Sequence, residues 1–255
     1  MNPNADPAAN PLPPPYPQPR PPEAPLPENL DFKTLFEALL RRPHDLVARL
    51  ATPGHDATGK FALIAFVSFL LFGVVLGCFA KHEQLWAAPL KVSAGIFIAG
   101  AICFPSLYIF STLAGAKTSV AQLGACLAGA LALSGLLLLG FSPAIWIFAE
   151  STDSFGFMGT LGLLAWLIAV IFSLKFLLAA VRSTGGTQSG PLGIWCAVFL
   201  LVTLQMTTSL RPILGRSDKF LTQEKKFFIQ HWFDSIDLSL KTPAKKITDT
   251  ESPDQ

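Results

Sequence analysis

The stretch from Phe61 to Ala80 constrains this chain more than any other, because it is twenty residues long and holds no charged side chain. A helix of that length spans about 30 Å, the thickness of the hydrocarbon core of a bilayer. Four more apolar runs follow it, so the expected spans are 61–80, 92–114, 120–141, 157–181 and 191–210. The sequence therefore predicts an all-α fold, an integral membrane bundle of about five transmembrane helices over residues 61–210, with amphipathic interfacial helices on both flanks.

Composition supports this class and argues against a soluble one. Helices of a soluble domain each keep a polar face, whereas here 51% of residues are hydrophobic, 14% are charged, and the charges lie mostly in the tails. The lipid bilayer is the expected partner. A net charge of +2 is too small to indicate nucleic-acid binding.

The first 30 residues predict a disordered, proline-rich tail. They contain twelve prolines and no apolar run, which also argues against a secretory signal peptide. The PxxP spacings in this tail suit the aromatic groove of a protein partner, and a stiff spacer is the simpler alternative.

Residues 31–52 predict two short amphipathic helices at the membrane interface, separated by Pro43. In the first helix, Phe32, Leu35, Phe36, Leu39 and Leu40 follow one helical face. We expect Arg41, Arg42 and Arg49 to contact lipid headgroups. The alternative is a helical pair that packs on another protein or on loops of this chain.

The segment 211–240 predicts a second interfacial helix, and residues 241–255 predict a loose, disordered tail. A broad aromatic face and a basic side run through this helix. The residues expected at the headgroups are Arg211, Lys219, Lys225, Lys226 and Trp232. Docking onto a partner protein is the competing interpretation.

Charge does not fix the orientation. With five spans the tails lie on opposite sides, and the six basic residues near the membrane on the N-terminal side are Arg41, Arg42, Arg49, Lys60, Lys117 and Arg182. The seven on the other side are Lys81, Lys91, Arg211, Arg216, Lys219, Lys225 and Lys226. This near tie leaves open that one run fails to cross. We favour a cytoplasmic N-terminus, because moving a charged tail across the membrane without a signal peptide is unfavourable.

Small and polar residues inside the spans have two interpretations. Gly95 and Ala99 in the second span, and Gly124 and Ala128 in the third, predict close helix packing. Lys175 is expected to extend its ammonium to the headgroups, and lining a polar path is the alternative. The same alternatives, interhelical hydrogen bonds or a pathway, apply to the polar end of the fifth span, which includes Thr203, Gln205 and Thr208.

No motif indicates catalysis, a cofactor or a metal. The four cysteines lie in separate apolar runs and the four histidines lie far apart, so neither set has the spacing of metal ligands. Signatures of hydrolases, metalloproteases and phosphate-binding loops are missing from the sequence. We therefore expect a non-enzymatic protein without cofactors.

The exit from the fifth span, Gln205 to Gly215 (QMTTSLRPILG), resembles that of a family of bacterial multi-span inner-membrane proteins of unassigned activity. Phe227, Phe228 and Trp232 would match the aromatic-rich helix that follows in this family. A looser resemblance, through span number and the segment RRPHDLVARLA, is to the five-span membrane family that interacts with Rab GTPases. The first resemblance implies a location in the bacterial inner membrane.

These observations favour a scaffold or accessory subunit whose tails contact lipid headgroups or a partner protein. The alternative function is a small transporter or channel component that uses the polar end of the fifth span.

Overall fold

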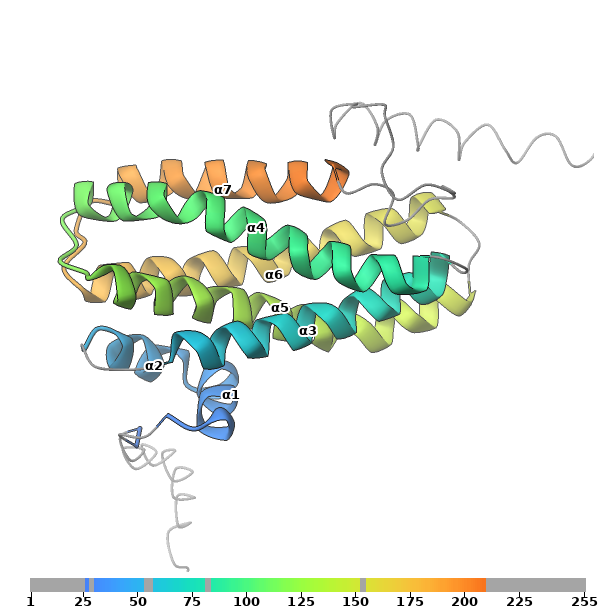
Figure 1. The fold of residues 1–255 in the computed structure, drawn as a ribbon, viewed down its shortest axis with the longest axis horizontal. Coiled ribbons are helices and arrows are strands. Elements are labelled where there is room, and N and C mark those ends of the chain that lie inside the picture. The colour runs from blue at the N-terminus through green and yellow to red at the C-terminus, as the bar shows by residue number, and fades with distance from the viewer. Residues whose placement is uncertain (1–25, 28–29, 53–56, 81–83, 152–154, 210–255) are drawn as a thin grey trace, which may run out of the picture.

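The computed structural model describes residues 26–27, 30–52, 57–80, 84–151 and 155–209. Within these ranges the chain forms seven helices and no strand (Figure 1): α1 (Phe32–Arg41), α2 (Pro43–Leu50), α3 (Thr58–Ala80), α4 (Gln84–Leu113), α5 (Val120–Ser151), α6 (Phe155–Ser183) and α7 (Ser189–Ser209). Helices α3 to α7 are long and apolar enough to cross a bilayer. The predicted all-α membrane bundle with two short flanking helices is thus confirmed.

Two helices extend about two turns or more beyond their expected apolar runs. Helix α4 begins at Gln84, so the expectation that residues 81–91 form a connection is wrong from Gln84 onward. Helix α5 continues through Pro143 to Ser151. A proline removes one intrahelical hydrogen bond, but membrane helices tolerate this loss because neighbouring helices and side chains satisfy the freed groups. Proline therefore marks helix ends less reliably here than in water.

Helix α5 forms the centre of the bundle. Within the apolar stretch of α5, 72% is buried inside the bundle, whereas the value for the apolar stretch of α7 is 22%. Its largest contacts are with α3 and α6, while α4 packs mainly on α3 and α7. The third span is thus central, as its small residues predict, but its main partners are the first and fourth spans instead of the second.

The four helices α4 to α7 form two similar hairpins, offset by 70 residues. The loops at 114–119 and 184–188 hold Gly115 and Gly185, which have φ values of +89° and +103°. After each helix a Schellman-type bond closes the turn, from Ala116 N–H to Ser111 O (3.0 Å) and from Gly186 N–H to Val181 O (3.4 Å). Residues 111, 115 and 116 of the first turn correspond to residues 181, 185 and 186 of the second, so the two turns have the same geometry.

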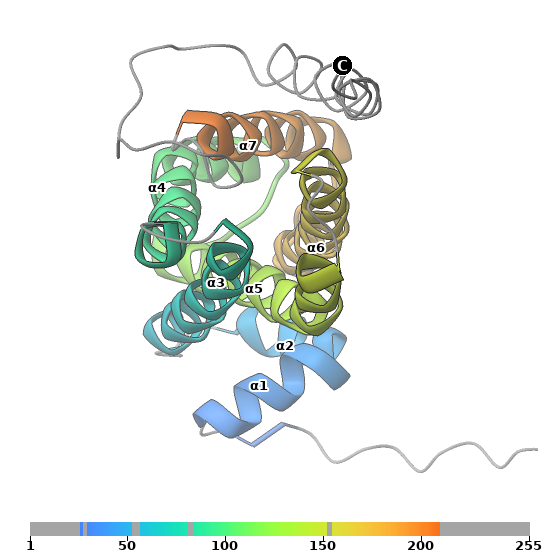
Figure 2. The ribbon, with the colours of Figure 1, turned by 90° about the vertical axis from the view of Figure 1, so that its right-hand side faces the viewer.

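The two loops also bind each other reciprocally. Lys117 N–H donates to Thr184 O, and its equivalent Thr187 N–H donates to Ala114 O, both at 3.0 Å. Viewed along the bundle, α4, α7, α6 and α5 form a ring, and α3 packs outside it against α4 and α5 (Figure 2). Contacts are large between α4 and α7 and between α5 and α6, and small within each hairpin. The hairpins are thus related by a pseudo-two-fold axis along the bundle.

Helix α3 approaches two neighbouring helices closely at glycine positions. A Cβ atom added to Gly73 would lie 2.5 Å from Pro89 Cα of α4, a distance that real Cβ atoms do not show. Elsewhere along α3, a Cβ on Gly135 of α5 would lie 3.0 Å from Ser68 Cβ. Glycine at these two positions lets three helical backbones approach one another, which drives helix association in lipid.

Candidate membrane-interface site

The α1–α2 unit, residues 32–50, packs on the flank of the bundle near the start of α3 (Figure 1). Gln122 of α5 donates its side-chain N–H to Ala51 O at 3.1 Å, just after α2. Lys60 of α3 donates to Leu30 O at 2.7 Å, just before α1. Both ends of the unit are therefore fixed to membrane-spanning helices.

The apolar face of α1 is wider than its contact with the protein. Leu35 and Leu39 are fully buried, whereas Phe32, Phe36 and Leu40 remain 46–49% exposed. The exposed residues follow the spacing i, i+4, i+8, so they form one stripe beside the buried one. The predicted amphipathic face is thus divided between the bundle and the surroundings.

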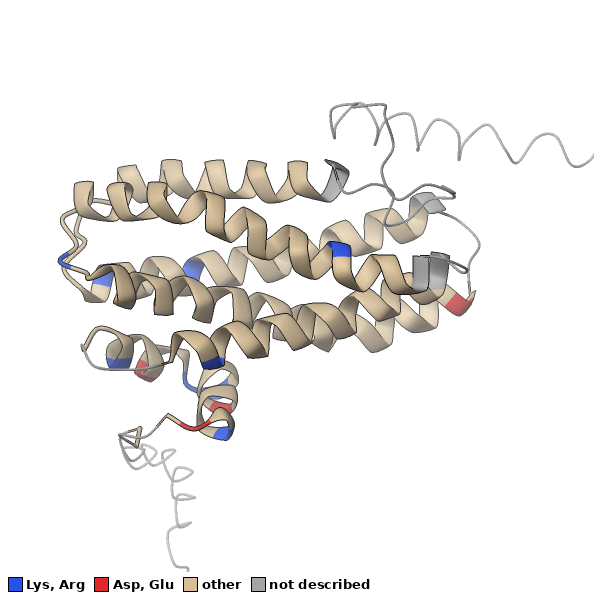
Figure 3. Cartoon of the chain, viewed as in Figure 1, with Lys and Arg blue, Asp and Glu red and all other residues tan. Residues whose placement is uncertain are grey.

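Basic side chains gather around this unit (Figure 3). Arg41 is exposed and lies 3.5 Å from Glu37, and Arg42 forms an ion pair with Asp45 at 2.9 Å. Arg49 donates to the Thr52 hydroxyl at 3.0 Å. Pairs of this kind at a surface add little stability. The net positive charge of this end of the bundle therefore stays available to anionic headgroups.

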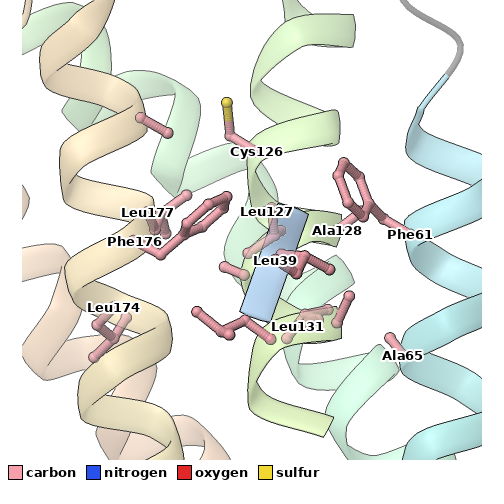
Figure 4. Packing of buried hydrophobic residues seen from close by; sticks show 14 of the residues in the cluster. Leu39, Phe61, Ala65, Cys126, Leu127, Ala128, Leu131, Leu174, Phe176 and Leu177 are labelled. Atoms are coloured by element: carbon pink, nitrogen blue, oxygen red, sulfur yellow. The ribbon is translucent and has the colours of Figure 1, made fainter. Parts of the chain in front are cut away.

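Lys175 of α6 lies at the depth at which α3 begins. A Cβ on Gly129 of α5 would be 3.2 Å from the Phe176 ring and 3.6 Å from the Phe61 ring, so the two rings flank α5 at one level (Figure 4). Lys60 and Lys175 immediately precede these phenylalanines. Because α3 starts at Thr58, both lysines lie close to the end of the bundle that carries the α1–α2 unit.

The Lys175 side chain points away from the bundle interior. It is exposed, and its Nζ lies 5.5 Å from the centroid of the Phe172 ring, within the range of a cation–π interaction. A path between the helices would require an inward side chain. The geometry therefore favours the headgroup interpretation of Lys175 over the pathway interpretation.

Lys91 is the basic residue that sequence analysis misplaced. It lies inside α4 and is only 4% exposed, whereas the sequence placed it in a connection. Its spacing of four residues from Gly95, and eight from Ala99, continues the stripe of small residues on that span. That spacing was the available signal, but the expected second span began only at residue 92.

The other predicted site residues, in the packing stripes and at the polar end of the fifth span, differ in burial. Gly95, Ala99 and Ala128 are buried, and Gly124 is half-buried, where an added Cβ would lie 3.8 Å from the Phe104 ring of α4. Thr203 is buried and donates to Phe199 O at 2.9 Å within its own helix, and Gln205 is half-buried. The side chain of Thr208 lies outside the described residues, as do Arg211, Lys219, Lys225, Lys226 and Trp232.

Within the described residues no group of His, Cys, Asp or Glu could hold a metal ion. The four cysteines are separate, and two of them, Cys103 and Cys126, are fully buried. We find no matching protein-family model, curated protein or solved structure for this chain. The two family resemblances therefore stay predictions, and the functional argument depends on the geometry of the chain itself.

Proposed function

We propose that this protein is a non-enzymatic scaffold or accessory subunit of the bacterial inner membrane, anchored to one leaflet by the α1–α2 unit. The division of the α1 apolar face carries this proposal. The stripe formed by Phe32, Phe36 and Leu40 is 46–49% exposed in the described part of the chain and lies beside basic side chains. Such a helix is typical of an element that enters the boundary between headgroups and acyl chains.

In this proposal the outward stripe of α1 contacts acyl chains while the basic residues contact phosphates. Arg41 and Lys33 lie on the polar side of α1, and Lys60 and Lys175 mark the same end of the bundle. Near an anionic membrane surface each basic residue adds about 1 kcal/mol of attraction. The anchoring leaflet is the cytoplasmic one, because Lys175 belongs to this basic end and Lys91 is inside the bundle.

The proline-rich tail supplies the proposed partner site. Leu30 is buried and its carbonyl accepts a hydrogen bond from Lys60, so the residue that precedes α1 is fixed at the basic end of the bundle. A protein partner with an aromatic groove would thereby be held at the membrane surface. Accessory subunits and scaffolds act through such recruitment.

Site-directed nitroxide labels test the anchoring. In full-length protein reconstituted in nanodiscs, a label at position 36 should be accessible to oxygen, which dissolves in acyl chains. A label at the neighbouring position 37 should be accessible to a water-soluble nickel chelate. Equal accessibility of both labels to the nickel chelate would show that α1 lies in water and would refute the anchoring.

A transporter or channel component is the second candidate, and Lys91 is the observation that favours it. An ionisable residue enclosed among spans is a functional-site candidate. Ion or solute flux through reconstituted protein should then respond to Lys91→Met and not to Lys175→Met. Equal flux in all three proteins and in empty vesicles would remove this candidate.

A further inference from the structure

One face of α5 is covered by α4 and α3. Leu131 contacts α4, because a Cβ atom placed on Gly100 would lie 3.3 Å from the Leu131 Cδ1 atom. Gly135 contacts α3, because a Cβ atom placed on it would lie 3.0 Å from Ser68 Cβ. The α5 residues that share this face by helical spacing are Gly124, Ala128, Leu131 and Gly135. Gly124 is half-buried and the other three are buried.

The equivalent face of α7 is exposed. With the offset of 70 residues between the hairpins, this face comprises Ile194, Val198, Leu201 and Gln205. The first three residues are 59%, 44% and 55% exposed. Helix α3 packs against both α4 and α5, whereas no described helix packs in this way on both α6 and α7 (Figure 2). The bundle thus has two copies of a helix-binding face, and the described helices fill one of them.

The exposed side of α7 also has the residue pattern with which membrane helices pair. Gly193 and Ala197 are exposed and lie four residues apart, and each is followed by a β-branched residue, Ile194 or Val198. Among the described residues, no atom lies within 4 Å of a Cβ placed on Gly193. Small residues at this spacing let two helix backbones approach, and β-branched side chains have little rotamer freedom to lose when they pack.

We propose that this α7 face binds the same face of a second copy of the chain, so that the protein is a dimer in the membrane. The face consists of Gly193, Ile194, Ala197, Val198 and Leu201. A two-fold contact uses one surface twice, so the surface must be self-complementary. Here a line of small residues runs beside a line of large apolar ones, and each line can receive the other from the second copy. This inference goes beyond the proposed anchor and does not depend on it.

The direction of α3 supports a second copy as the occupant. The Phe61 ring of α3 lies beside Gly129 of α5, and Ser68 lies beside Gly135, so α3 and α5 run in the same direction. A helix that takes the equivalent place on the second hairpin therefore runs in the same direction as α7. The α7 helix of a second copy meets this condition, because a two-fold axis along the membrane normal preserves helix direction.

Single-molecule photobleaching counts the chains in each particle. The full-length protein, with one fluorophore at its C-terminus, is reconstituted in vesicles of phosphatidylcholine and phosphatidylglycerol over a range of protein-to-lipid ratios. The wild type should bleach in two steps at the higher ratios. At the ratio where half of the wild-type chains are dimeric, Ala197→Leu should raise the dissociation constant about tenfold, which leaves about 15% of chains dimeric. Ala101→Leu, at an exposed position of α4, is the matched control and should dimerise like the wild type.

These variants leave the α4–α7 contact in place. Ala197 follows Trp195 by two residues, so it lies on the opposite side of α7 from the hydrogen bonds that Trp195 donates to α4. The proposal is overturned if the wild type bleaches in one step at every ratio, or if Ala197→Leu dimerises like the wild type.

Disulfide cross-linking locates the contact without adding bulk to α7. Single cysteines are placed at positions 193, 197 and 201 of α7 and, as controls, at the exposed positions 98 and 102 of α4, in a background lacking the native cysteines. Mild oxidation in vesicles should cross-link the α7 positions between chains and leave the α4 positions unlinked. Equal cross-linking at both helices would indicate random collision, and cross-linking at α4 alone would place the contact elsewhere; either result would refute the proposal.

Discussion

The two hairpins, α4–α5 and α6–α7, have the same turn geometry but carry their lysines at different positions, one enclosed in the bundle and one exposed. The first hairpin carries an enclosed lysine, Lys91, where the second has Leu161. The second carries an outward lysine, Lys175, where the first has Pro105. A lysine in a span can thus be held by the bundle or extend to the headgroups. A place inside an apolar span therefore does not by itself decide whether a lysine is enclosed.

The two hairpins also differ in which other helices pack on them. Helix α3 packs on the first hairpin through Gly73, and the α1–α2 unit packs on α5 and α6. Helix α7 depends almost entirely on α4 for its contacts. Variants at the α4–α7 contact and at the α3–α4 contact should therefore show how much each contact stabilises the bundle.

The largest effect is expected at the joint between α4 and α7. The Trp195 ring is buried, donates two hydrogen bonds to α4 and stacks on Phe199 with a centroid distance of 5.1 Å. Trp195→Ala should lower the unfolding free energy by about 3 to 5 kcal/mol, measured by denaturation in mixed micelles. Trp146→Ala, at an exposed position of α5, is the control. Equal losses in both variants would contradict the proposed joint.

The next effect concerns the contact of α3 with the first hairpin. Gly73→Ala places a Cβ against the backbone of Pro89, so α3 must move away. The cost should be about 1 to 3 kcal/mol, measured in the same way. Gly140→Ala has open space around it and should cost nothing. A stable Gly73→Ala variant would show that the helices are further apart than described.

The pseudo-symmetry of the loops predicts two equal effects. Both Gly115 and Gly185 have positive φ values, which cost an L-residue about 1 to 2 kcal/mol. Gly115→Ala and Gly185→Ala should each lower the unfolding free energy by about this amount. If only one of the two variants loses stability, the turns are not equivalent.

The smallest effect is expected for Lys175. Its side chain is exposed and does not enter the core. Lys175→Gln should change the unfolding free energy by less than about 0.5 kcal/mol and should modestly weaken the preference for anionic lipids. Native mass spectrometry of retained lipids measures this preference. A large loss of stability would place this lysine inside the bundle.

The sequence predicted the five spans and the two short helices because hydrocarbon selects long apolar runs and Pro43 separates the helices locally. It missed the first turns of α4 and the last turns of α5, where prolines and charged residues are typical of loops in water. It also missed the burial of Lys91, which depends on how α4 packs in the bundle. Local patterns do not contain this information.

The sequence analysis also missed the repeat of the two hairpins, because few residues are identical between them. The hairpins share Gly115 with Gly185 and Ser119 with Ser189, but few other identical residues. Their equivalence appears in the reciprocal bonds of the loops. Of the predicted packing residues, Ala99 and Ala128 are buried, while the close approach of α3 to α4 occurs at Gly73, which the spacing of small residues did not indicate.

The central claim is that five helices cross the membrane, with both hairpin turns on the side of the α1–α2 unit. Single cysteines at positions 117, 187 and 150, in a background lacking the native cysteines, test it in intact cells with an impermeant maleimide. Positions 117 and 187 should be labelled from the same side, and position 150 only from the other. Labelling of 117 and 187 from opposite sides would contradict the account.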